Sequence, residues 1–170
     1  MNETTPIVPA AATSGMVDTD ERMDGHDVVS TLEHLATTAE DGAKGFAQAA
    51  EHVDDSRIAQ VFTELGAERA RFAEELRAFI ATRYQEVVTE EGSIKAAIHR
   101  GWIALKDALT GTDVHAVVAA AESGEDYALE QYNEAIEKPL PNDIAAVVSR
   151  QRSAVKAAHD RVRNLKDATE

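Results

Sequence analysis

The sequence predicts an all-α protein, an antiparallel four-helix bundle with one crossover connection that contains a short fifth helix. Three observations predict it. Apolar residues recur every three or four positions along most of the chain, which is the period of one helix face. The 170 residues include 31 alanines, 4 prolines and only 5% aromatic residues, a composition that favours helices over sheets. Finally, two of the breaks in the apolar pattern are short and one is long.

Composition and charge exclude several classes of function. The chain has no cysteine, which excludes a disulfide scaffold, a cysteine zinc site and a cysteine nucleophile. Acidic residues outnumber basic ones 31 to 17, and the net charge of −14 argues against binding to nucleic acid or to an anionic membrane surface. No stretch reaches the roughly 20 apolar residues of a membrane span, and no signal-peptide pattern opens the chain. We therefore expect a soluble cytoplasmic protein.

Residues 1–26 are predicted to form a disordered acidic tail, and residues 27–170 the helical bundle. The tail has no amphipathic period, and its second half gathers like charges, which disfavours a packed core. The acidic residues concerned are Asp18, Asp20, Glu21 and Asp24. Such a tail either keeps the protein soluble or docks a protein partner.

Two long helices are predicted in the first half of the bundle. The first covers about 27–53, where Ser30 and Glu33 have the spacing of a capping box. Asp54-Asp55-Ser56 interrupts the pattern and can cap the second helix, which covers about 56–88. So tight a link forces the two helices to be antiparallel neighbours.

The second half of the chain predicts another such pair. A short helix over about 93–109 carries Trp102, and a long helix with an aspartate at its N-cap covers about 113–137. Pro141 is well placed to begin the last helix, which runs to about residue 167. The longer connection between the two pairs permits a crossover along the bundle. This is the ferritin-like variant of the four-helix bundle.

Polar residues interrupt the apolar stripes near the middle of the bundle. Arg69 stands at core spacing in the second helix, and Glu125 and Gln151 stand at similar heights in the last two helices. A buried arginine needs a carboxylate, because an unpaired buried charge is costly. We predict that Arg69 pairs with Glu125 or with Asp41. The buried polar layer of Arg69, Glu125, Gln151 and Asp41 either fixes the helix register or is the remnant of a cofactor or small-ligand site.

A ferritin-like bundle raises the question of a di-metal site. Di-iron and di-manganese carboxylate proteins of this type use a Glu from each of two helices and Glu-x-x-His from each of the other two. No histidine of this chain has a glutamate three residues before it. We therefore predict no cofactor. Iron or manganese held by Glu125, His159 and Glu68 is the alternative that the residues leave open.

Trp102 and His99 are candidate interface residues of a homodimer or a higher homo-oligomer. Alanine-rich helices bury little area per residue, and contact between copies would add apolar burial. Glycines inside the predicted helices indicate close helix crossings, and a cavity beside them that carries a small molecule is the alternative. These glycines are Gly42, Gly45, Gly66, Gly101 and Gly124.

Several short motifs, taken together, resemble one family. They are Asp41-Gly42 with Gly45-Phe46, Glu68-Arg69 with Phe72, His99-Arg100-Gly101-Trp102, Gly124-Glu125, and Val155-Lys156 with His159-Asp160. Over about residues 28–167 the chain resembles a bacterial family of ferritin-like four-helix-bundle proteins, distantly similar to rubrerythrins and known as a domain of unknown function. The resemblance implies a homo-oligomer and a link to the general stress response, with no established activity.

The resemblance also bears on the metal. Rubrerythrin-like relatives carry Glu-x-x-His in the second long helix and in the last one, where this chain has Arg69 with Phe72 and Lys156 with His159. Glu125 matches the ligand position of the third helix, which implies that one acid and one histidine remain while the rest of the site is replaced.

We therefore predict a non-enzymatic, self-associating, stress-related bundle without an intact di-metal site. The alternatives are an atypical metal-binding or redox protein that uses Glu125 and His159, and a small-molecule carrier.

Overall fold

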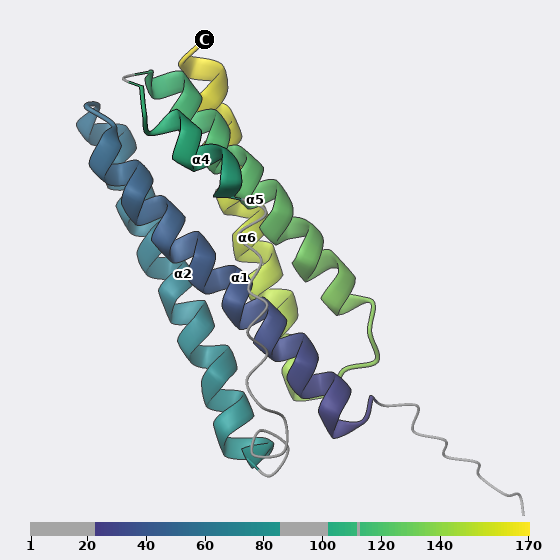
Figure 1. Cartoon of the computed structure of the whole chain (residues 1–170). Helices are drawn as coiled ribbons and strands as arrows, with labels where there is room; N and C mark the ends of the chain where they lie inside the picture. The colour runs from purple at the N-terminus through teal and green to yellow at the C-terminus, as the bar shows by residue number, and fades with distance from the viewer. Residues whose placement is uncertain (1–22, 86–101, 112) are drawn as a thin grey trace, which may run out of the picture.

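A computed structural model describes residues 23–85, 102–111 and 113–170 of the chain (Figure 1). Within these ranges the elements are all helices, and none of the described helices is long and apolar enough to cross a membrane. The all-α prediction is confirmed. The helices are α1 (Gly25–His52), α2 (Ser56–Arg83), α4 (Ile103–Ala108), α5 (Val114–Ile136) and α6 (Asn142–Ala168).

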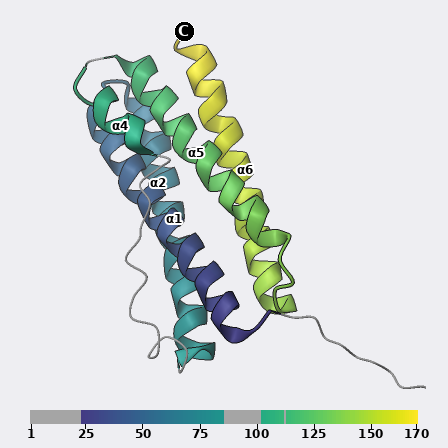
Figure 2. The ribbon, with the colours of Figure 1, turned by 45° about the vertical axis from the view of Figure 1, so that its right-hand side comes forward.

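The helices form two antiparallel hairpins that lie side by side (Figures 1 and 2). α1 packs along α2, α5 packs along α6, and α1 also packs on α5. The connection between α2 and α5 joins opposite ends of the bundle. Its last part, α4, packs on α5. α2 and α6 touch only sparsely, and their seam is bridged by the ion pairs Glu64–Arg161, Glu75–Arg150 and Arg83–Asp143.

Aspartates cap three of the long helices at their N-termini. Asp24, Asp55 and Asp113 each accept a hydrogen bond from a backbone amide two or three residues further along, which satisfies an N–H that the helix itself leaves unpaired. Because Asp24 supplies this cap, α1 begins at Gly25, inside the segment predicted to be tail. The capping box predicted at Ser30 therefore does not begin the helix.

Three other boundaries differ from the prediction. α2 ends at Arg83, short of the predicted end near residue 88. α6 begins at Asn142, with Pro141 as its N-cap residue rather than its first helical residue. Of the short helix predicted over 93–109, the described part is α4, with Trp102 at its N-cap position. Residues 1–22 of the predicted tail lie outside the described residues.

The apolar core divides into two clusters. One contains Leu32 and Leu35 of α1 together with the C-terminal half of α2 and the N-terminal half of α6. The other contains Phe46 of α1, Phe62 of α2 and the N-terminal half of α5. On α1, α2 and α5 the residues between the two clusters include Asp41, Arg69 and Glu125, all of them buried. Three members of the predicted polar layer therefore lie between the two halves of the core, whereas the fourth, Gln151, lies within the first cluster between Val148 and Val155.

Candidate functional site

A buried ion pair lies at the centre of the bundle. Arg69 of α2 and Glu125 of α5 are both 0% exposed. Arg69 Nη2 donates to Glu125 Oε2 at 2.6 Å, and Arg69 Nε donates to Glu125 Oε1 at 3.3 Å. This two-point contact matches the planar fork of a guanidinium to both oxygens of one carboxylate. Of the two partners predicted for Arg69, the structure pairs it with Glu125.

A second carboxylate meets the same guanidinium. Arg69 Nη1 donates to Glu68 Oε1 at 3.1 Å, and the Glu68 side chain is partly open to solvent. Thus Glu125 binds the guanidinium on its buried side, and Glu68 binds it nearer the surface. The positive charge of Arg69 is therefore balanced by two carboxylates.

The neighbouring helix leaves room for the arginine stem. A Cβ atom at Gly42 of α1 would lie 3.3 Å from Arg69 Cγ, which is tighter than most van der Waals contacts. The guanidinium carbon of Arg69 lies 5.5 Å from the ring centroid of Phe72, within the range of a cation–π contact. The long side chain of Arg69 therefore packs against both Gly42 of α1 and Phe72 of α2. Asp41 is buried beside Gly42 in the same layer.

Burial and pairing act in opposite directions on Glu125. Burial raises the pKa of the Glu125 carboxyl above its ordinary value, and the charge and hydrogen bonds of Arg69 oppose that rise. An arginine keeps its proton in proteins, so the counter-charge is permanent. The charged form of Glu125 in the core depends on Arg69.

Gln151 connects α5 to α2 next to this pair. Its Oε1 accepts a hydrogen bond of 2.7 Å from the hydroxyl of Tyr132, which is fully buried. Its Nε2 donates to Glu75 Oε2 at 2.8 Å and to the backbone oxygen of Phe72 at 3.4 Å. Burial raises the pKa of Tyr132 well above its ordinary value, so the hydroxyl stays a donor. Core spacing predicts Gln151, whereas it does not distinguish Tyr132 from the apolar residues of its stripe.

His159 of α6, a predicted metal ligand, is held by two aspartates. Its Nε2 lies 2.7 Å from Asp126 Oδ1 and its Nδ1 lies 3.0 Å from Asp160 Oδ1. Two carboxylates can both accept only from the protonated ring, because a neutral imidazole has one N–H. Burial lowers the pKa of His159, but the hydrogen bonds to Asp160 and Asp126 outweigh it, and the pKa lies above its ordinary value.

We expect this contact to make stability depend on pH. Because the folded-state pKa of His159 is raised, the stabilisation is fully present below the ordinary pKa of 6.5 and is lost as pH rises through the folded-state value. Replacing His159 with glutamine should lower the free energy of unfolding by about 1 kcal/mol at pH 6, a modest value because solvent screens both exposed aspartates. Urea unfolding of both proteins from pH 5.5 to pH 9 measures the difference. A difference that stays constant over this range would contradict the assignment.

The predicted metal ligands do not form a metal-binding group. Both oxygens of Glu125 accept from Arg69, Glu68 accepts from the same guanidinium, and both ring nitrogens of His159 face aspartates. Among residues 23–85, 102–111 and 113–170, no three His, Asp or Glu side chains are grouped so that they could hold a metal ion. The described residues therefore do not fit a di-metal centre.

Trp102, a predicted interface residue, packs against its own bundle. Its ring meets the ring of Phe46 edge-on, with centroids 5.0 Å apart and an interplanar angle of 72°. A Cβ atom at Gly45 or Gly124 would lie within 2.4 Å of the indole, so these glycines make room for a side chain rather than for a close helix crossing. Gly66 does mark a crossing, because a Cβ atom there would lie 3.3 Å from the backbone oxygen of Ala43. The other predicted interface residue, His99, and the predicted crossing at Gly101 lie outside the described residues.

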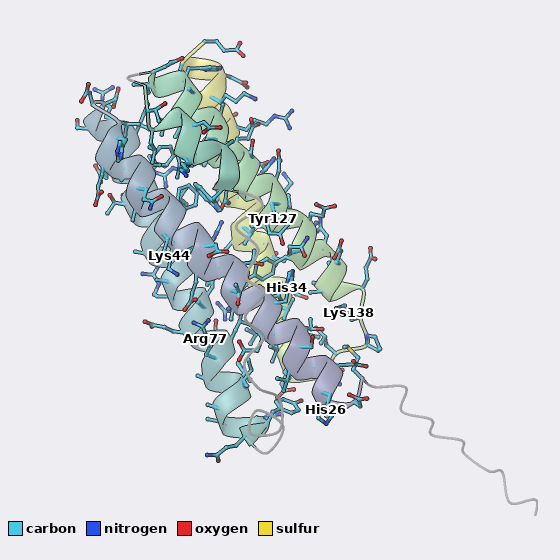
Figure 3. All side chains as sticks on the ribbon, in the orientation of Figure 1. His26, His34, Lys44, Arg77, Tyr127 and Lys138 are labelled. Atoms are coloured by element: carbon cyan, nitrogen blue, oxygen red, sulfur yellow. The ribbon has the colours of Figure 1, made fainter. Side chains whose placement is uncertain are left out.

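Polar contacts also join the helices at the surface (Figure 3). His34 Nε2 of α1 donates to Gln131 Oε1 of α5 at 2.5 Å, and Lys138 Nζ donates to Thr31 Oγ1 at 3.1 Å. Arg77 of α2 pairs with Glu40 of α1. These contacts hold α1 against its two neighbours, and they combine no nucleophile with a base.

Comparison with known proteins supports the fold. A family model described as a domain of unknown function (DUF2383) matches residues 27–138. A solved structure from Thermotoga maritima, described as that of a candidate ferritin-like diiron-carboxylate protein, matches with a TM-score of 0.64 and 20% sequence identity. The match covers 88% of this chain and 98% of that chain. No curated protein matches the sequence. The fold is therefore ferritin-like, as the sequence predicted.

Proposed function

We propose that this chain has a non-enzymatic function, in which a buried arginine takes the place of a di-metal centre. The chain belongs to the DUF2383 family and has a ferritin-like fold. The observation that carries the proposal is the contact between Arg69 and both oxygens of Glu125. By its resemblance to rubrerythrin-like proteins, Glu125 stands at the position of a metal ligand in the third long helix. In this chain it binds a side-chain cation instead.

The electrostatics of the layer support this proposal. A buried carboxylate is stable only beside a positive charge, which either a metal ion or a guanidinium can provide. Here the guanidinium is fixed by hydrogen bonds to Glu125 and Glu68 and cannot lose its proton. A metal ion at this place would have to displace the guanidinium of Arg69, and the positive charge of that group would repel it. A redox or ferroxidase reaction needs that metal, so we propose that the bundle acts by binding rather than by catalysis.

Titration with Mn²⁺ tests the proposal on the purified protein. We expect calorimetry to show the same response to Mn²⁺ for the wild-type chain and for the matched variant Glu125→Gln. Saturable binding to the wild type that is lost in both Glu125→Gln and His159→Gln would overturn the proposal and would establish the alternative of an atypical metal site.

We also propose that the protein self-associates in the cytoplasm. Among the described residues, Ile136, at 40% exposure, is the only large hydrophobic side chain that is exposed. Copies with a net charge of −14 repel each other, and salt screens this repulsion. Sedimentation velocity at micromolar concentration should therefore show more dimer at about 500 mM salt than at about 50 mM, where the Debye length is longer. A monomer at both salt concentrations would contradict self-association.

Two parts of the proposal concern physiology. The family resemblance supports a role in the general stress response, which predicts that the protein becomes more abundant when cells enter stress. The acidic N-terminal segment is proposed to dock a protein partner. Deleting residues 1–22 should then abolish capture of that partner and leave the helical circular dichroism signal of the bundle unchanged. A protein level that stays constant under stress would contradict the first part, and capture by the shortened chain would contradict the second.

A further inference from the structure

Two facing glycines leave a slot between α1 and α5, and the ring of Trp102 fills it. A Cβ atom at Gly45 of α1 would lie 2.2 Å from Trp102 Cε3, and one at Gly124 of α5 would lie 2.4 Å from Trp102 Cε2. Both distances are too short for any real carbon contact. The indole therefore occupies the space that an alanine side chain would need on either helix. We call Gly45, Gly124 and the adjoining Phe46 the glycine slot.

The slot fits a flat aromatic ring. Its two walls are the backbones of α1 and α5 at the glycines, and Phe46 presents its ring to the indole in the edge-to-face arrangement that aromatic pairs prefer. Phe46 is itself fixed by the core, where its ring lies 5.7 Å from that of Phe62. Glycine inside a helix is less stable than alanine, so a glycine on each wall indicates that the bound ring compensates for both.

The slot contributes to holding α4 on the bundle. Trp102 stands at the N-cap of α4, where no side chain caps the helix, and α4 has only six residues. Helices this short have little stability of their own. Trp102 is also only partly buried. The contacts of the indole with Gly45, Gly124 and Phe46, together with the buried Leu105, therefore anchor α4 to the bundle.

We propose that the glycine slot is a binding site for a planar bicyclic aromatic ring of indole size, which the chain occupies with its own Trp102. A free small molecule of this class binds there when the tryptophan side chain is removed. The inference concerns α1, α4 and α5 and is independent of the proposal about the metal. It gives the small-molecule alternative of the sequence analysis a defined location and ligand class.

The first test uses Trp102 as a probe, since it is the only tryptophan of the chain. Gly45→Ala and Gly124→Ala should each displace the indole, shift its fluorescence emission to longer wavelength and raise its quenching by acrylamide. Gly111→Ala is the control, because a Cβ atom there would meet no atom closer than 3.9 Å. Emission and quenching that stay at the wild-type values in both slot variants would overturn the proposal.

The second test measures the binding of 5-fluoroindole by fluorine NMR. We expect saturable binding to Trp102→Ala, binding at least tenfold weaker to the wild type, and none to Trp102→Ala combined with Gly124→Ala. Equal binding to the single and double variants, or no binding to a folded Trp102→Ala, would overturn the ligand site. If circular dichroism shows that Trp102→Ala is unfolded, Trp102→Val takes its place and the same two outcomes decide.

Discussion

Replacing Arg69 with methionine is expected to lower the free energy of unfolding by about 3–5 kcal/mol at neutral pH. The variant keeps the apolar stem of the side chain and removes its charge. Glu125, which is 0% exposed, then has no strong counter-charge. Its pKa, already raised by burial, rises further once the opposing effect of Arg69 is gone. Urea unfolding followed by circular dichroism measures the loss.

The pH dependence of this loss has a definite sign. A carboxyl whose folded-state pKa is raised destabilises the folded protein as pH rises above the ordinary value, which is 4.5 for glutamate. The difference between wild type and Arg69→Met should therefore be largest at neutral pH and should shrink below pH 4.5. A difference that grows on acidification would contradict the assignment of the loss to Glu125.

A double variant provides the control. Arg69→Met combined with Glu125→Leu removes both charges and leaves apolar side chains in the layer, a replacement that is often neutral in buried pairs. We expect it to recover most of the stability lost in Arg69→Met. If the double variant instead loses as much stability as the two single variants lose together, the two side chains are not coupled.

The second large effect is expected at Gln151. Replacing it with leucine removes the acceptor of the buried Tyr132 hydroxyl and should cost about 1–3 kcal/mol, the range for an unsatisfied buried donor. Tyr132→Phe removes the donor instead and should cost less. In the Tyr132→Phe background the effect of Gln151→Leu should be smaller, because no buried hydroxyl is left unpaired. Equal effects of Gln151→Leu in both backgrounds, measured by urea unfolding, would contradict the hydrogen bond.

Most of the fold could be predicted because periodicity and link length are local properties. Apolar spacing located the four long helices, and the short links between paired helices implied their antiparallel order. The start of α1 was misplaced because Asp24 and Ser30 are both good N-cap residues, and only the structure shows that Asp24 accepts from the Asp27 amide. Local sequence alone does not decide between two such caps.

The candidate site could be predicted where a buried charge requires a partner of opposite charge. Arg69 at core spacing had to meet a carboxylate, and Glu125 stood at a matching height. The surroundings of His159 were not predicted, because Asp126 and Asp160 compete for it with other nearby acids, and the outcome depends on side-chain geometry. The slot of Trp102 was missed for a further reason. It requires Gly45 and Gly124 to face each other across two helices far apart in the sequence, and no pattern within one helix records that.

The metal content of the protein tests most directly whether Arg69 takes the place of a di-metal centre. Untagged protein is purified without chelators from cells grown with added iron and manganese, and elemental analysis gives the metal per chain. We expect no stoichiometric iron or manganese in the wild type. About two iron or manganese ions per chain, the content of a di-metal ferritin-like site, lost in Glu125→Gln, would contradict it.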